Sequence, residues 1–136
     1  MGDRPLSIFE VSGRAMSAQL VRMNTTASNL ANAGAVASSE NAAYRTQKPV
    51  FRTHFDAASG MSTVDVESVV TAGAAPTKRY DPGNPMADKD GNVWEAAVDE
   101  TQELVDMLET ARSYQNNVEV LQTAKSLILD TLKLGR

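Results

Sequence analysis

The sequence predicts a mainly α-helical fold with a small β insert, in which long N- and C-terminal helices pack antiparallel as a coiled-coil-like pair. Apolar residues recur every seven positions near both ends of the chain, whereas turn residues are concentrated in the middle. Heptad repeats are typical of helices that pack along their length, and clusters of Gly and Pro interrupt helices. We therefore expect residues 1–34 and 97–136 to form a helical core domain, and residues 35–96 to form an irregular, β-rich insert.

The N-terminal helix is predicted to begin after Ser7 and to end near Asn32. Ser7 and Glu10 have the spacing of a capping box, and Gly34 is a suitable residue just past the helix end. Its apolar residues form one row with a seven-residue repeat and a second row four positions later. This predicted packing seam consists of Phe9, Met16, Leu20, Met23, Ala27 and Leu30.

The C-terminal helix is predicted over residues 98–134, a stretch without Pro or Gly. Acidic residues crowd its start and basic residues come later, an order that suits the helix dipole. A helix of this length would extend ~55 Å, which is long for a globular domain. Its predicted packing seam consists of Leu104, Met107, Ala111, Tyr114, Val118, Leu121, Ile128 and Leu132.

The two seams together carry more apolar surface than two helices of unequal length can bury in each other. Leu108, Leu127 and Leu129 widen the C-terminal stripe further, so we expect both seams to pack against other subunits as well. Polar amides inside helical bundles can fix register. The candidates for this role are Asn24, Asn29, Asn32, Asn116 and Asn117. A helical core closed within one chain, with these Asn side chains in solvent, is the alternative interpretation.

The middle of the chain predicts two to four short strands. Residues 44–55 are rich in strand-forming residues, and Pro49 confines them to an edge or a bend. Residues 61–69 contain Val at nearly alternating positions, and residues 77–80 form a third candidate strand. Residues 81–85, with two prolines, predict a turn.

No pattern in the sequence supports an enzyme, a cofactor site or a metal site. His54 is the only histidine, and it lies in a strand-like segment without a nucleophile motif. Asp88, Asp90 and Asn92 resemble the opening of a calcium loop, but Gly91 comes too early and no Glu closes the loop. We therefore predict no catalytic, cofactor-binding or metal-binding residues, and a turn at residues 88–92.

Composition excludes several classes of partner and site. The net charge is −4 and there is no basic run, which argues against nucleic acid as a partner. The absence of Cys excludes disulfides and thiolate metal sites. No stretch has the length of a membrane span, and the first residues do not form the apolar core of a cleaved signal peptide.

Several short segments, spread over nearly the whole chain, match the pattern of a known protein family. They are residues 27–33 (ASNLANA), 44–45 and 48–51 (YR and KPVF), 80–88 (YDPGNPMAD), 111–121 (ARSYQNNVEVL) and 131–135 (TLKLG). The chain therefore resembles the flagellar rod and hook axial proteins, and residues 80–88 favour a member from the proximal rod.

This resemblance implies a structural subunit that polymerises helically into the hollow rod of the basal body, which transmits motor torque and passes exported subunits. The implied partners are copies of the chain itself, other flagellar rod proteins and the flagellar type III export apparatus. The implied location is the rod within the cell envelope, in the periplasmic space, after export without a cleaved signal peptide. The alternatives are a soluble helical adaptor or export chaperone that does not polymerise and, from another class, a small hydrolase that uses His54.

Overall fold

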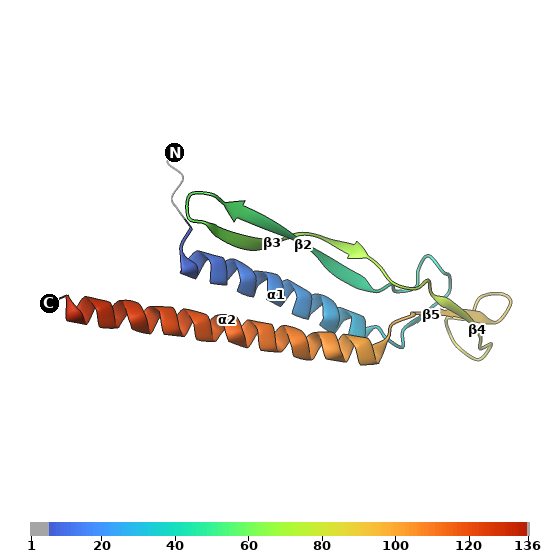
Figure 1. Ribbon diagram of the computed structural model, residues 1–136. Helices are drawn as coiled ribbons and strands as arrows, with labels where there is room; N and C mark the ends of the chain where they lie inside the picture. The colour runs from blue at the N-terminus through green and yellow to red at the C-terminus, as the bar shows by residue number, and fades with distance from the viewer. Residues whose placement is uncertain (1–5, 136) are drawn as a thin grey trace.

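The computed structural model describes residues 6–135, which form two helices and five strands. The molecule is elongated: the two helices run antiparallel side by side, a long hairpin lies along one of them, and a small sheet lies at one end (Figure 1). The elements are α1 (Ile8–Ala31), β1 (Val36–Ala37), β2 (Gln47–Asp56), β3 (Met61–Thr71), β4 (Thr77–Tyr80), β5 (Asn92–Glu95) and α2 (Glu100–Leu134). Residues 1–5 and 136, which the predicted helical core included, lie outside the described part.

The prediction of a mainly α fold with a small, irregular β insert was wrong. The terminal helices exist, but the chain is 45% helix and 24% strand, and its middle is an ordered β structure with two sheets. The β2–β3 hairpin has strands of 10 and 11 residues and runs back along α1. The fold is therefore α+β, because a long hairpin and two helices share one packed body.

Both helices begin with the local chemistry expected of helix starts. The Ser7 side chain accepts a hydrogen bond from the Glu10 amide at 3.2 Å, as the capping box predicts. The Glu10 carboxylate, however, bonds to Arg14 at 3.1 Å in place of returning to the cap. Helix α2 is capped by Asp99, whose side chain accepts from the Gln102 amide at 3.1 Å.

The β2–β3 hairpin is twisted, and its two strands cross each other along α1 (Figure 1). The first half of β3 contains the fully buried Thr63, whereas residues 50–55 of β2 and 67–71 of β3 are all exposed. The pairing is antiparallel, from Gln47 opposite Thr71 to Asp56 opposite Met61, with a bulge between Val50 and Phe51. Bulges increase local twist, which explains the crossing of the two strands.

The small sheet has the strand order β1–β5–β4 and holds Val93 at its centre. The loop from β4 to β5 is closed by the predicted turn: the Asp88 carboxylate accepts from the amides of Asp90 and Asn92, each at 2.9 Å. Gly91 has φ +77°, and a Cβ there would lie 3.0 Å from the Tyr80 ring. Only Gly fits this position without displacing Tyr80.

The core of the described chain is thin and made of small residues. Its buried apolar residues are Ala18, Ala37, Ala43, Val93 and Ala96. Within residues 6–135 no Leu, Ile, Met or Phe side chain is fully buried. Because buried apolar area is the main stabilising term in folding, this subunit by itself has little to hold its helices together.

Candidate assembly surfaces

Helix α2 turns one face towards α1, and this face is polar near its start. Glu103 and Thr110 are buried on it, and Met107, Tyr114 and Leu121 share the face at helical spacing and are half-buried. Of the predicted seam of this helix, Ala111 and Val118 are also half-buried. The remaining predicted seam residues of α2 are exposed, namely Leu104, Ile128 and Leu132.

Helix α1 buries a different face from the one that carries its predicted seam. Its buried residues are Ser12, Ala18, Thr25, Thr26 and Asn29. At 3.6 residues per turn, the predicted seam is centred about a third of a turn away from them. Three seam residues are exposed, namely Phe9, Leu20 and Ala27. The other three are half-buried, namely Met16, Met23 and Leu30. The small buried residues allow close approach of α2 and the hairpin, while much of the larger apolar seam stays uncovered.

A polar junction of Tyr44, Gln47, Lys48, Glu103 and Asp106 around Asn29 joins α1, β2 and α2. The Asn29 amide nitrogen donates to Glu103 Oε2 at 3.0 Å and to the Gln47 carbonyl at 2.9 Å. Its amide oxygen accepts from the Gln47 backbone N–H at 2.9 Å and from the Tyr44 hydroxyl at 2.7 Å. All four hydrogen-bonding positions of the Asn29 side chain are therefore used inside the chain.

The charges of the polar junction are paired across the same three elements. Lys48 Nζ lies 3.0 Å from both Glu103 Oε1 and Asp106 Oδ2. On the other side, Arg22 of α1 lies 3.7 Å from Asp106 and 3.4 Å from Glu109. These ion pairs hold the start of α2 between α1 and the hairpin.

The pKa values of two junction groups are shifted in the directions that favour charge. Burial by itself raises the pKa of Asp106, but hydrogen bonds from Lys48 and Gln102 and the nearby cations outweigh burial and lower the pKa below its usual value. Burial likewise lowers the pKa of Lys48, and hydrogen bonds to Asp106 and Glu103 outweigh it and raise the pKa. The pair is therefore ionised at neutral pH.

The five predicted register-setting Asn residues take different positions. Asn29 is the centre of the polar junction, whereas Asn32 and Asn117 donate to carbonyls of their own helices, at 2.8 Å to Ser28 and 2.9 Å to Ser113. Asn24 and Asn116 are exposed on α1 and α2. A role of these amides in register between subunits stays a prediction.

Helix α2 extends well past the start of α1 (Figure 1). The pairs Asn29 with Glu103 and Arg22 with Glu109 run in opposite directions along the two helices. Continuing this pairing puts the first residue of α1 opposite about residue 124 of α2, so residues 125–134 form an overhang. The large apolar residues of this overhang are all exposed: Leu127, Ile128, Leu129, Leu132 and Leu134.

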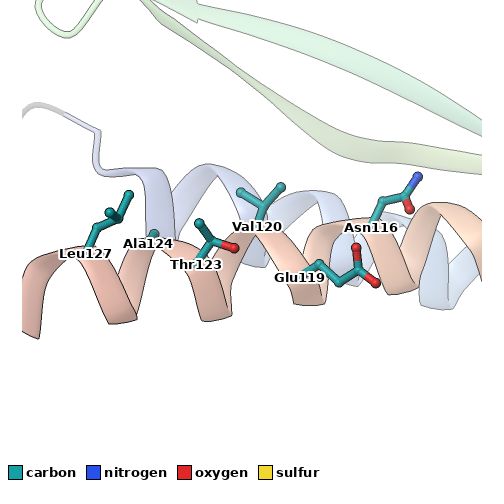
Figure 2. A pocket seen from close by; sticks show the side chains of 6 residues that line it. All are labelled: Asn116, Glu119, Val120, Thr123, Ala124 and Leu127. Atoms are coloured by element: carbon teal, nitrogen blue, oxygen red, sulfur yellow. The ribbon is translucent and has the colours of Figure 1, made fainter.

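Three surface hollows are each lined by α2 alone. Figure 2 shows the largest, of about 510 Å³, with all six side chains projecting from α2: Asn116, Glu119, Val120, Thr123, Ala124 and Leu127. The second, of about 490 Å³, includes Val105 and Leu108, and the third lies on the overhang. Because no second element supplies an opposing wall, these hollows are uncovered helix surface.

The residues that could carry chemistry are not assembled into a site. His54 is exposed on β2, opposite Thr63 in the hairpin. Residues 6–135 contain no group of three or more His, Cys, Asp or Glu side chains that could hold a metal ion. Over the same part of the chain, no helix is both long and apolar enough to cross a membrane.

Comparison with known proteins assigns the family. The family described as "Flagella basal body rod protein" matches residues 9–34, and "Flagellar basal body rod FlgEFG protein C-terminal" matches residues 89–134. The chain is 45% identical over 133 residues to the flagellar basal-body rod protein FlgC of Salmonella typhimurium, covering 96% of this chain and 98% of that protein. This chain belongs to the FlgC family of flagellar basal-body rod proteins.

Other FlgC proteins match over the same length. FlgC of Escherichia coli is 42% identical over 131 residues, covering 96% of this chain and 98% of that protein. FlgC of Buchnera aphidicola from Schizaphis graminum is 38% identical over 132 residues, covering 96% and 97%. The membership inferred from short motifs is thus confirmed. In this FlgC-family chain the two matched ranges contain nearly all of α1 and α2, and the β2–β3 hairpin lies outside both.

Sequence reasoning missed most of the polar junction. The sequence marks Lys48 only as a residue of a predicted strand. It marks Glu103 and Asp106 only as part of the acidic start of the C-terminal helix. A charged residue such as Glu103 within a heptad pattern is normally assigned to solvent, and no local pattern marks it as buried. One feature of the sequence could have indicated the junction. The start of α2 has more acidic residues than favourable interaction with the helix dipole requires, which predicts that a basic side chain from another part of the chain pairs with them.

Proposed function

We propose that this chain is a structural, non-catalytic subunit of the flagellar basal-body rod. In this proposal it polymerises helically with its own copies and with other rod proteins into the hollow shaft that transmits motor torque and passes exported subunits. The observation that carries the proposal is the overhang of α2, whose large apolar side chains have no cover within the described chain.

The geometry of the overhang supports enclosure by several neighbours. Consecutive helical residues point about 100° apart, so Leu127, Ile128 and Leu129 face three different directions. Leu132 and Leu134, which are 64% and 87% exposed, lie on the same sides as Ile128 and Leu127, four and seven residues earlier, and enlarge those two surfaces. The polar side chains of Ser126, Asp130 and Lys133 occupy the remaining side of the overhang, so its apolar side chains need cover on more than one side but not all round. One partner helix covers only one side, whereas several neighbouring subunits would cover all the apolar sides.

The predicted seams fit the same role. The exposed face of α1, with Phe9, Leu20 and Ala27, would meet neighbouring helices on the outside of the α1–α2 pair. We further propose that the helical ends of the chain act as the packing domain and that the β structure between them faces other rod components. The division at residues 34 and 97 belongs to this proposal.

Export and location also belong to this proposal. The thin core supports passage in an unfolded state through the flagellar type III export apparatus, because little buried area must be given up. The resulting location would be the rod in the periplasmic space, reached without a cleaved signal peptide. The names of the relatives are those of rod proteins, which supports a role without catalysis.

The proposal is tested by a substitution that places a charge in the overhang. Leu132→Asp should abolish incorporation into purified basal bodies and motility, because it places a carboxylate in an apolar subunit contact at a cost of several kcal/mol. Since Leu132 is exposed in the single chain, the circular dichroism and solubility of the monomer should not change. The matched control is Gln122→Asp, an exposed polar position of the same helix, which should retain motility.

The competing adaptor function predicts other results. A non-polymerising adaptor would be absent from purified basal bodies, and Leu132→Asp cells would swim normally. Either result would overturn the rod-subunit proposal. Detection of the wild-type chain in basal bodies, together with loss of the Leu132→Asp chain from them, supports it.

A further inference from the structure

Arg112 and Glu119 carry opposite charges on the outer face of α2. Both side chains are exposed, and among the ion pairs of residues 6–135 none includes either of them. Arg112 comes two and a half turns after the buried Glu103, so it points away from α1. Glu119 lies ~10 Å further along the helix axis and points the same way, which is too far for the two charges to pair with each other.

The two charges belong to a row of exposed residues that repeats every seven positions, the spacing of a face that packs on another helix. The row is Val105, Arg112, Glu119 and Ser126. Large apolar side chains flank it, among them Leu108 and Leu127, which are 73% and 62% exposed. Two of the hollows on α2 lie along this row, one within residues 105–115 and the other within residues 116–127. The boundary between the hollows falls midway between Arg112 and Glu119.

We propose that the free subunit forms a dimer in which α2 packs antiparallel on α2 of a second copy through this row. The two-fold axis passes between residues 115 and 116, so that Arg112 of each copy faces Glu119 of the other. The same axis sets Val105 opposite Ser126 and brings each hollow against the other hollow of the second copy. A second copy is the occupant because this single axis pairs both charges and covers both hollows.

The charges select the antiparallel orientation. Two α2 helices packed parallel and in register would place Arg112 beside Arg112 and Glu119 beside Glu119, and like charges at close range repel. The antiparallel orientation also places the acidic start of one helix, with Asp99 and Glu100, near the Lys133 end of the other. Opposed helix dipoles favour this arrangement further.

The dimer goes beyond the proposed rod function, because it concerns the subunit before assembly. A two-fold contact uses the same patch on both copies and closes on itself, so it cannot extend into a helical polymer. Ion pairs between exposed side chains are weak and are screened by salt, which suits a contact that must open again. Assembly into a rod would therefore require the dimer to dissociate.

Charge reversal tests the contact in the purified full-length chain, with the dimer Kd measured by sedimentation equilibrium. Arg112→Glu alone sets two carboxylates against each other at both ends of the contact and should raise the Kd by about tenfold or more, as should Glu119→Arg. The double variant Arg112→Glu/Glu119→Arg should restore the Kd to within about threefold, because opposite charges face each other again. Lys89→Glu, which reverses an exposed charge on the β4–β5 loop, is the matched control and should leave the Kd unchanged.

Disulfide cross-linking tests the orientation without background, because the chain has no Cys. The double variant Val105→Cys/Ser126→Cys should form a covalent dimer on oxidation, since residues that face each other across a helix pair can meet the distance needed for a disulfide. Each single variant should stay monomeric. In the antiparallel dimer the two copies of Val105 lie ~30 Å apart along the helix axis, as do the two copies of Ser126.

A chain that is monomeric at every concentration, or a double charge reversal that does not restore the dimer, would overturn the antiparallel contact. Covalent dimers from Val105→Cys alone would overturn it as well, because they require a parallel pair. All substituted side chains are exposed, so unchanged circular dichroism should show that each variant is folded. The rod function would stand in each case, because it is scored separately by motility and basal-body content.

Discussion

The Asn29 amide donates to the Glu103 carboxylate across 3.0 Å, at a place where the two residues are only 0% and 3% exposed. This bond joins the last turns of α1 to the first turn of α2, and Asn29 also bonds both backbone groups of Gln47 at the start of the hairpin. Buried polar networks are stabilising only when every member is satisfied. The polar junction is therefore the point at which the three long elements of the subunit are fixed to each other.

Asn29→Ala should destabilise the subunit by about 2–4 kcal/mol. The change leaves the Gln47 N–H and carbonyl without their partner and removes one donor from the buried Glu103, and each unsatisfied buried group costs about 1–3 kcal/mol. Urea unfolding followed by circular dichroism measures the loss. Asn24→Ala, at an exposed position of the same helix, should change the unfolding free energy by less than about 0.5 kcal/mol. Equal effects at both positions would contradict the role of the polar junction.

Lys48→Met should destabilise the subunit by about 2 kcal/mol, because it leaves the buried Glu103 carboxylate without its cation. The value is at the low end for buried pairs, since the Lys48 side chain is 40% exposed and partly screened by solvent. The pKa of Lys48 is raised, so its contribution is present at neutral pH and is lost only as the pH rises above the ordinary value of 10.5.

The double variant Lys48→Met/Glu103→Gln separates this ion pair from other effects of each change. It should be less destabilised than the sum of the single variants, with a coupling of about 1–2 kcal/mol. Additive single effects, measured by the same urea titration, would show that the pair at 3.0 Å contributes nothing to stability.

Asp106→Asn should make the free energy of unfolding depend less on pH in the acid range. The pKa of Asp106 is lowered in the folded chain, so the unfolded state binds its proton first as the pH falls. Its contribution is therefore full well above the ordinary value of 3.8 and is lost as the pH falls through the lower, folded value. Unfolding free energies at pH 7 and pH 3 should differ less for Asp106→Asn than for the native chain. A difference as large as that of the native chain would contradict the assignment.

The positions of the regular elements could be predicted from the sequence because local chemistry determines them. Ser7 caps α1, and the segments predicted as strands correspond to β2, β3 and β4. The docking of these elements could not be predicted in the same way. Alternation along β3 shows that its side chains point to two faces, but not that Thr63 is buried while Val69 is exposed.

The buried face of α1 illustrates a second limit. Ser12, Thr25 and Asn29 are buried, yet each is of a type that is mostly exposed in proteins. The heptad of larger residues, which includes Phe9 and Leu20, predicts a seam that the single chain leaves largely uncovered. Apolar residues that pack inside the chain and apolar residues that would pack against other subunits appear in the sequence as one combined pattern. Deciding which residues serve the internal contact requires the positions of the polar partners Glu103 and Gln47.

The free monomer should be ordered at one end of the helix pair and frayed at the other. At the polar junction, bonds to Asn29 and the Lys48 ion pairs tie α1 and α2 to the hairpin. At the opposite end, residues 125–134 have no covering element, and isolated helical turns are marginal in water. Ordering each residue costs about 1–2 kcal/mol of backbone entropy, which exposed Leu side chains do not offset until they are buried by neighbours.

Amide exchange on the dilute monomer measures this gradient. Exchange should be fastest at residues 125–134, intermediate near Leu121, and slowest around Glu103 and Asn29. In assembled rods residues 125–134 should become strongly protected, because their apolar side chains are then buried by other subunits. The native chain at concentrations below assembly serves as the reference, and Asn29→Ala should extend fast exchange into both helices. Uniform protection of α2 along its whole length in the monomer would contradict the coupling of helix order to assembly, since the overhang would then be stable without any neighbour.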